Sequence, residues 1–400
     1  MFKFLFFIFS ALCYGSVTEP DKTWDERISL PTLEYGNSLQ PAKKSELDEV
    51  KHILKDPDNI ISRKFKIPAG LKDRVFFWAK IYAVYPYQTS VIHDRNDVSV
   101  IYKVVDIKDA DKEKKVIRAV LDKIKLAGGV KNFIPSTPEE KRIRSVAKDS
   151  SLSEDVRVQQ GQKDNIINGV KASSKYMPFI EDVFKKDDLP WELTRIPFVE
   201  SSFNLKANSK VGARGIWQIM GGTGQQFMNT EDVYDERYSP FKASAVAAKI
   251  LKENYSVFKN WSLAVTAYNH GTGGVKKACK QLKTEDLAKI VAEYKDARFG
   301  FASQNFYSEF LAALYVTSYA EKLFGHIEKE QSMNFYYVEV EKDITMSKLS
   351  HISGLSFKEI ALYNPEFSKE ILSGEVSIKT GSKIKLPPRA SYKVEEYFVR

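Results

Sequence analysis

The pattern of hydrophobic and polar positions changes several times along the first half of the chain. Residues 74–85 (RVFFWAKIYAVY) are apolar and aromatic enough to predict a buried helix. Residues 88–92 and 98–105 are rich in β-branched side chains and flank an Asp-Arg-Asn-Asp turn, which predicts two short strands. Residues 112–125 predict a basic amphipathic helix. The polar, Ser-rich residues 135–164 predict a surface helix or linker that contains a domain boundary.

From residue 176 to about residue 325 the pattern predicts helix after helix with short connections. Residues 241–258 are the clearest example, because their apolar positions recur at the i, i+3, i+4 spacing of a packed helical face. Clusters of Gly and Asn interrupt the region at 208–215, 221–224 and 269–274. We therefore expect an all-α domain with glycine-rich insertions.

The pattern shifts again in the last part of the chain. Strand-like runs at 335–340 and 382–386 enclose two short helical segments at 346–351 and 357–363. This order predicts a β-α-α-β unit of about 50 residues. A Pro-Pro pair closes the unit, and the charged residues 389–400 predict a mobile tail.

The first residues are typical of an export signal. Lys3 precedes about nine apolar residues and small residues follow, which predicts a signal peptide over residues 1–16. The run is too short for a mature membrane anchor, which needs roughly 20 residues, and no other stretch approaches that length. We expect export to the periplasm or cell envelope without a stable membrane span. A lipid anchor at Cys13 is the alternative, although the bulky Leu12 is atypical of lipoprotein cleavage sites.

Composition narrows the class of partner and excludes cysteine chemistry. With 400 residues the chain exceeds the usual size of a single core, so two or three domains are expected. A net charge of +9 favours an anionic partner such as an envelope polymer, but the sequence contains no compact basic cluster or nucleic-acid motif. Removal of Cys13 with the signal peptide leaves Cys279 alone, which excludes an intramolecular disulfide and a cysteine-based metal site.

The sharpest candidate for chemistry is a carboxylate at the end of a predicted helix. Glu200 follows the apolar residues 196–199 (IPFV), and such surroundings disfavour ionisation and raise the pKa of a carboxyl group. A general acid that cleaves a glycosidic bond needs that property. The alternative is a surface glutamate near a helix C-terminus, where the helix dipole slightly disfavours negative charge.

Two clusters downstream of Glu200 combine glycines with aromatic and amide side chains. In residues 209–220, glycines allow close backbone approach before Trp217 and Gln218, which offer an aromatic face and an amide to a sugar. In residues 267–274, Tyr268 and Asn269 end an apolar helix before a glycine-rich turn. Taken alone, the two clusters are explained as well by a core Trp and a helix cap.

The order and spacing of these elements carry a family resemblance. The sequence E-S-S-F, then G-x-W-Q about 15 residues later, then A-Y-N-x-G about 50 further on resembles lytic transglycosylases. Their catalytic domain has the soluble-lytic-transglycosylase, goose-lysozyme-like fold, and the nearest likeness is to the membrane-bound D type. The resemblance covers roughly residues 176–325. It implies that Glu200 is the catalytic acid/base and that a glycan groove is lined by Ser201, Trp217, Gln218, Tyr268 and Asn269.

One position departs from the family pattern. The family usually places a Tyr directly after the Asn of its last motif, whereas Phe306 follows Asn305 in this chain. Tyr307 stands one residue further along. Either Tyr307 substitutes for the usual tyrosine in the groove, or the hydroxyl is dispensable.

The C-terminal unit resembles a LysM domain, a peptidoglycan-binding module that recognises N-acetylglucosamine. The closing residues 378–387 (IKTGSKIKLP) are the specific part of the likeness, with Asn364-Pro365 and the opening strand at 337–340 in support. Residues 341–344 replace the Gly-Asp-Thr turn that is common in the family, so the fold is better supported than sugar affinity. A purely structural cap is the alternative.

Together these features predict a mainly α chain. We expect a lysozyme-like all-α catalytic domain, a mixed α/β N-terminal region and a small β-α-α-β LysM domain. The expected divisions are a signal peptide (1–16), a lead-in segment (17–60), an N-terminal region of unknown role (61–165), the catalytic domain (171–330), the LysM domain (335–388) and a tail (389–400).

The carboxylates near Glu200 bear on the mechanism. Residues 201–230 contain no Asp or Glu, which argues against a lysozyme arrangement with a second carboxylate nearby, although Glu231 or Asp232 could fold back. One carboxyl group would then act twice. It would cleave the MurNAc–GlcNAc β-1,4 bond of peptidoglycan strands and form 1,6-anhydro-MurNAc ends, with no metal or organic cofactor. The alternatives are a non-catalytic peptidoglycan-binding scaffold and a lysozyme-type muramidase that hydrolyses the bond. A nucleic-acid partner is not expected.

Overall fold

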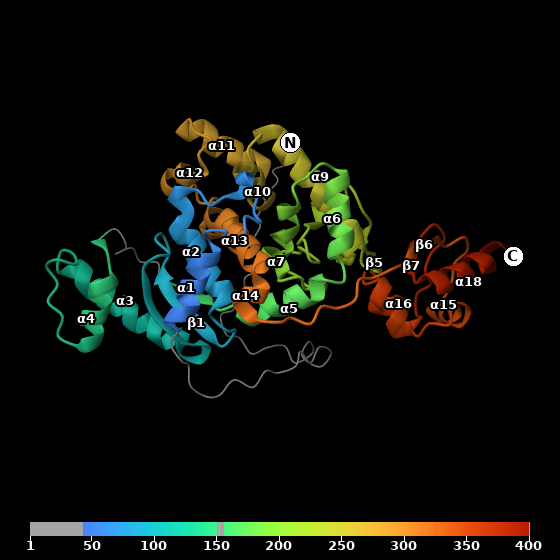
Figure 1. The fold of residues 1–400 in the computed structure, drawn as a ribbon, viewed down its shortest axis with the longest axis horizontal. Coiled ribbons are helices and arrows are strands. Elements are labelled where there is room, and N and C mark those ends of the chain that lie inside the picture. The colour runs from blue at the N-terminus through green and yellow to red at the C-terminus, as the bar shows by residue number, and fades with distance from the viewer. Residues whose placement is uncertain (1–42, 150–151, 153–155, 400) are drawn as a thin grey trace.

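The computed structural model describes residues 43–149, 152 and 156–399 as three units in a row (Figure 1). A large central body lies between a small α/β unit, at the left of the view, and a C-terminal unit at the right. Each unit has its own hydrophobic core. Helices dominate, so the expectation of a mainly α chain is confirmed. The predicted signal peptide, Cys13 and most of the lead-in segment lie outside the described residues.

The central body is a bundle of helices around one buried helix, α13 (Phe301–Ser318). Every residue of α13 from 305 to 316 is buried, because other helices cover it on all sides. Its neighbours include α2 (Lys72–Ala83), α7 (Ile196–Ser201) and α10 (Trp261–His270). The other helices of this body are α1 (Lys44–Ile53), η1 (Arg63–Phe65), η2 (Ala69–Leu71), α5 (Lys163–Ser173), α6 (Met177–Lys186), η5 (Trp191–Arg195), α8 (Gly221–Gly224), η6 (Glu236–Tyr238), α9 (Pro240–Phe258), α11 (Thr272–Leu282), α12 (Leu287–Glu293) and α14 (Ala320–Phe324). No helix in the described part of the chain is long and apolar enough to cross a membrane.

Helix α2 joins the central body instead of forming a separate N-terminal region with the strands that follow it. It was predicted as a buried helix, and its aromatic side chains are buried in the same core as the helices after residue 163. The indole Nε1 of Trp78 donates a hydrogen bond to Asn305 Oδ1 on α13 at 3.1 Å. The N-terminal region expected over 61–165 is therefore divided between two cores, because α2 is apolar on too many sides for a small sheet to cover.

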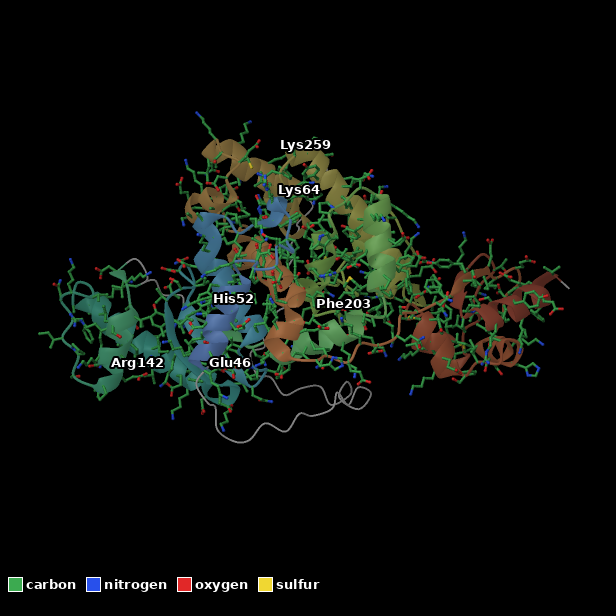
Figure 2. The ribbon with its side chains drawn as sticks, in the orientation of Figure 1. Glu46, His52, Lys64, Arg142, Phe203 and Lys259 are labelled. Atoms are coloured by element: carbon green, nitrogen blue, oxygen red, sulfur yellow. The ribbon has the colours of Figure 1, made fainter. Side chains whose placement is uncertain are left out.

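The α/β unit contains the rest of that region. Its antiparallel sheet has the order β2 (Ile101–Asp106), β1 (Thr89–Asp94), β3 (Val156–Gln160), with Val91 opposite Val104 on one side and Gln159 on the other. Helices α3 (Ala110–Leu126) and α4 (Pro138–Val146) complete the unit, and Arg142 marks α4 in Figure 2. The stretch predicted as a linker or surface helix thus contains both α4 and an unforeseen strand, β3.

The C-terminal unit has the predicted order of elements with two additions. Strands β6 (Tyr336–Glu339) and β7 (Lys383–Leu386) pair antiparallel around α15 (Met346–Ser353), α16 (Phe357–Tyr363) and the unpredicted α17 (Lys369–Ser373). The prediction of a mobile tail over 389–400 is wrong for the described residues, because helix α18 (Pro388–Val399) packs against this core. Its apolar residues recur every four positions, at Ala390, Val394 and Phe398, and all three are buried.

A short hairpin of the central body contacts the C-terminal unit. It consists of β4 (Thr230–Glu231) and β5 (Tyr234–Asp235). The backbone N–H of Asp235 donates to the Glu366 carbonyl, and that of Ser368 donates to the Val233 carbonyl, both at 3.1 Å. Main-chain bonds across the junction hold the two units in a defined arrangement.

Candidate active site

Glu200 lies at the end of α7, where the backbone turns sharply. Ser202 and Phe203 both take left-handed conformations, with φ of 49° and 64°, directly after Ser201, the last residue of the helix. Phe203, labelled in Figure 2, is buried against the rings of Phe198 and Tyr176 and so anchors the turn. A Cβ on Gly169 of α5 would lie 2.5 Å from the Ser202 carbonyl oxygen, so glycine is required for α5 to cover this turn.

The Glu200 side chain is buried in apolar surroundings, as its sequence environment predicted. It is 3% exposed, which excludes the alternative of a surface glutamate. Burial raises the pKa of its carboxyl group to about 8. The hydrogen bonds of the described residues include none to its carboxyl oxygens. Glu200 is therefore protonated at neutral pH and is able to donate a proton.

A glycine-rich loop lies directly beside α7. The Ser201 hydroxyl donates to the carbonyl of Ile216 at 3.1 Å, so this side chain ties the helix to the loop. Gly215 has φ of 75°, and a Cβ there would lie 1.9 Å from the carbonyl oxygen of Arg237. Gln218 has φ of 47° and donates from Nε2 to the Gly215 carbonyl at 2.9 Å. Its Oε1 is buried and has no hydrogen-bond partner among the described residues.

Trp217 does not line a sugar-binding surface, and the expectation that it does is corrected. The indole is 0% exposed and stacks on Phe184, with ring centroids 5.6 Å apart. Its Nε1 donates to the Ser244 hydroxyl at 2.7 Å. The side chain is thus fully enclosed between helices α6 and α9, and its role is to fix the loop that presents Gln218.

Helix α10 brings Tyr268 and Asn269 to the same region. The Tyr268 hydroxyl donates to the Trp217 carbonyl at 2.9 Å, and this phenol also interacts electrostatically with Glu200. Asn269 Oδ1 accepts from the Ser303 hydroxyl at 3.2 Å, while its buried Nδ2 has no partner among the described residues. His270 Nδ1 lies 3.0 Å from the same hydroxyl, so a local hydrogen bond accounts for this histidine.

In the described part of the chain, the ring and charge interactions of Tyr307 do not involve Glu200. Its ring packs against Phe310, 5.9 Å away, and the charge that affects its hydroxyl is that of Tyr315 on the same helix. Phe306 instead faces Tyr268, with ring centroids 6.5 Å apart. Successive residues of a helix point about 100° apart, so a shift of one position turns the phenol away from Glu200.

Two residues near Glu200 were not predicted from the sequence. Tyr82 on α2 and Glu309 on α13 are each 1% exposed, and both interact electrostatically with Glu200. A signal for Glu309 exists, since it is the only charged residue in the apolar run 306–316 (FYSEFLAALYV). For Tyr82 the sequence offers none. Glu231 and Asp232 are exposed on the β4–β5 hairpin, so the carboxyl that approaches Glu200 comes from elsewhere.

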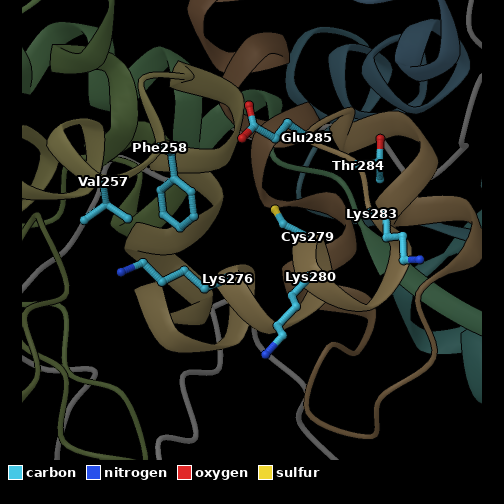
Figure 3. A pocket seen from close by; sticks show the side chains of 8 residues that line it. All are labelled: Val257, Phe258, Lys276, Cys279, Lys280, Lys283, Thr284 and Glu285. Carbon is cyan, nitrogen blue, oxygen red and sulfur yellow. The ribbon is translucent and has the colours of Figure 1, made fainter.

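Two cavities lie outside this region. One, of about 490 Å³, opens between α9 and α11 and is drawn in Figure 3; its lining includes Phe258, Cys279 and three lysines. The other, of about 460 Å³, lies between the loop after β1 and the loop before α13. Neither contains Glu200, Gln218 or Asn269. The described residues also contain no group of three or more His, Cys, Asp or Glu side chains able to hold a metal ion.

Part of the chain matches a known domain family. Residues 177–291 match the transglycosylase SLT domain. The matched range contains Glu200, Gln218 and Asn269, whereas Tyr82 and Glu309 lie outside it.

Proteins similar to this chain include enzymes named as lytic murein transglycosylases. The membrane-bound lytic murein transglycosylases D of Escherichia coli K12 and of E. coli O6:H1 are each 26% identical over 192 residues, which is 47% of this chain and 42% of theirs. A protein of Alteromonas sp. (strain M-1) named for tributyltin chloride resistance is 30% identical over 112 residues, 28% of this chain and 54% of its own. The similarity thus spans less than half of the length of the E. coli relatives.

Proposed function

We propose that this chain is a peptidoglycan lytic transglycosylase that cleaves the MurNAc–GlcNAc β-1,4 bond, with Glu200 as its acid/base residue. The observation that carries the proposal is a buried, protonated Glu200 inside the matched domain, with a pKa of about 8. Gln218 Oε1 and Asn269 Nδ2, a buried acceptor and a buried donor without partners among the described residues, lie on the loop and the helix that flank this region.

In the first step, Glu200 donates its proton to the oxygen that links the two sugars, and the bond between that oxygen and the muramyl C1 breaks. The positive charge that develops at C1 is stabilised by the acetamido group or by nearby dipoles. In the second step, the Glu200 carboxylate takes the proton of the muramyl C6 hydroxyl while O6 bonds to C1. The product is a 1,6-anhydro-muramyl end, no water is consumed, and Glu200 regains its proton.

Hydrolysis by a muramidase is the second candidate, because Glu309 is a second carboxyl near Glu200. A hydrolase needs that carboxyl ionised, either as a nucleophile or as a base for water. Burial, followed by the charge of Glu200, holds the pKa of Glu309 well above its usual range. Glu309 therefore resists the ionisation that a hydrolase needs, which favours the transglycosylase.

We further propose that the C-terminal unit, residues 335–388, is a LysM domain that binds glycan strands. Support comes from its element order and from the exposed aromatic side chains of Tyr336 and Tyr337 on β6, 59% and 49% exposed. Export by the predicted signal peptide would place the protein in the periplasm or cell envelope. Binding of purified sacculi by a Glu200→Gln protein with and without residues 335–399 tests the role of the unit.

The decisive experiment is digestion of purified sacculi by the wild-type protein and by Glu200→Gln, followed by mass analysis of the products. We expect anhydro-muramyl ends from the wild type and none from the variant, because an amide cannot donate the proton. The exposed Glu253 of α9 offers a matched control, and Glu253→Gln should retain full activity.

Other results would reject parts of the proposal. Hydrated reducing ends would identify a hydrolase. Binding of sacculi without any lysis by the wild type would identify a scaffold. Undiminished lysis by Glu200→Gln would remove Glu200 from the mechanism.

A further inference from the structure

Two buried polar groups beside Glu200 have atoms without a hydrogen-bond partner among the described residues. They are the hydroxyl of Tyr82 on α2 and Oε2 of Glu309 on α13. Both side chains are 1% exposed. An unpaired buried polar atom is costly and rare in native proteins, so two such atoms at one place require an explanation.

The packing of α2 on α13 places these two groups together. Trp78 on α2 is hydrogen-bonded to Asn305 on α13 at 3.1 Å, which aligns the two helices at this level. Tyr82 and Glu309 each follow their helix's bonded residue by four positions, and the two groups interact electrostatically with each other. Helix α13 also packs against α7, which carries Glu200. The two unpaired groups thus lie on a pair of packed helices, one of which also contacts the helix that carries Glu200.

The charged groups around this point are few. Glu200 interacts with Tyr82, Tyr268 and Glu309, from α2, α10 and α13. Arg157 on β3 acts on Glu309, and its guanidinium lies 4.1 Å from the centroid of the Phe301 ring.

The segment η5, which precedes α7 and contacts it, adds two more charged residues. Glu192 accepts a hydrogen bond from the backbone N–H of Ser62, and Arg195 pairs with Glu181. Both are therefore engaged with groups other than Glu200.

Tyr82 and Glu309 both resist ionisation. Burial is the main cause that raises the pKa of each; the charge of Glu309 and then that of Glu200 raise the pKa of Tyr82 further, and the charge of Glu200 raises the pKa of Glu309 further. A neutral carboxylic acid and a phenol are hydrogen-bond donors, and an ionised carboxylate is an acceptor. Hydrogen bonds that the two groups donate to Glu200 are therefore strongest when Glu200 has lost its proton.

We propose that Tyr82 and Glu309 are positioning residues that stabilise the ionised form of Glu200 by donating hydrogen bonds to it, directly or through one bound water. This inference rests on the proposed function, in which Glu200 is a carboxylate between the two proton transfers. The donors lower the free energy of that state inside an apolar site. Helix α2, which lies outside the matched domain, would thereby contribute to the active centre.

The test measures the rate of sacculus lysis from acidic to alkaline pH for Tyr82→Phe, Glu309→Leu and Glu309→Gln. Loss of a donor destabilises the carboxylate, so the pKa of Glu200 rises and the alkaline limb of the profile moves to higher pH. For Tyr82→Phe and Glu309→Leu we expect a shift of about one pH unit and a fall of about tenfold in the rate at neutral pH. Glu309→Gln retains a donor and should stay within about threefold of the wild type.

Tyr102→Phe is the matched control, because Tyr102 is also 1% exposed but belongs to the core of the α/β unit. Its pH profile should coincide with that of the wild type, and thermal melting checks that each variant folds. If Glu309→Leu fails to fold, Tyr82→Phe alone decides. An alkaline limb that stays in place in Tyr82→Phe overturns the proposal, even if the rate falls. Activity of Glu200→Gln would instead refute the proposed function, so the two failures are distinguishable.

Discussion

Replacing Glu200 by Gln should stabilise the folded protein while it abolishes lysis. In the folded state burial raises the pKa of Glu200 from 4.5 to about 8, whereas in the unfolded chain the carboxyl group is solvated. Between these two values the unfolded chain releases a proton that the folded protein keeps. The free energy of unfolding of the wild type therefore falls as pH rises through this window.

The size of the effect follows from the width of the window. Each pKa unit corresponds to about 1.4 kcal/mol. At pH 7 the free energy of unfolding of the wild type is therefore about 3 kcal/mol lower than with a neutral side chain of the same shape. The loss is absent below the unfolded pKa of 4.5 and complete above the folded value of about 8. Glu309 is present in both proteins, so its own titration largely cancels from the comparison.

Thermal melting and urea unfolding of the wild type and Glu200→Gln across this pH range measure the difference. We expect similar stability at about pH 4 and an advantage for the variant that grows with pH and levels off near pH 8. At about 2–4 °C per kcal/mol, the difference in melting temperature at pH 7 should be several degrees. The exposed control Glu253→Gln should show no such trend. A difference between wild type and Glu200→Gln that does not change with pH would refute the reasoning, because it would mean that Glu200 is solvated in the folded state.

Three further predictions test the surroundings of the site and the C-terminal unit. Trp217→Phe should lower the stability of the central body by roughly 2 kcal/mol, because packing and the hydrogen bond to Ser244 are lost; calorimetry measures this. The KM for sacculi, measured by lysis kinetics, should stay within about twofold of the wild type. Gly215→Ala should lower the free energy of unfolding by about 1–3 kcal/mol or more and reduce lysis, because φ at this position is positive and the added Cβ would meet the Arg237 carbonyl. Thermal melting and the rate of lysis measure the two effects. Val394→Asp should unfold α18 and expose the core of the C-terminal unit. Protease cleavage after residue 335 should then increase while the central body stays intact. Unchanged cleavage would show that α18 does not stabilise the unit.

Much of the local structure could be predicted from the chain alone. The i, i+3, i+4 spacing predicted α9, and the apolar run over 74–85 predicted α2. The sequence Ile-Pro-Phe-Val before Glu200 indicated a buried carboxyl with a raised pKa but left a surface glutamate as the alternative, and the structure decides for burial. These features depend on residues that are neighbours in the sequence, so a local pattern is sufficient to encode them.

Other features of the fold could not be predicted, because they depend on which distant helix or strand packs against a given segment. A tryptophan beside a glutamine suits a sugar surface or a core equally well, and only the position of Phe184 decides that Trp217 is buried. The charged segment 389–400 suggested a tail, yet its apolar stripe finds a core to pack on. The strand β3 is short and polar on one face, and pairing with β1 is what makes it a strand.

The sequence by itself determined that Glu200 is surrounded by apolar neighbours and is followed by two glycine-rich motifs. Only the tertiary structure decided which groups meet it. Tyr82 and Glu309 lie far from Glu200 in the chain, on helices that meet α7 through α13. The physical reason is that periodicity encodes the apolar face of a helix, whereas the partner of that face is selected by packing between distant segments. The same packing encloses polar groups that no local pattern marks as neighbours.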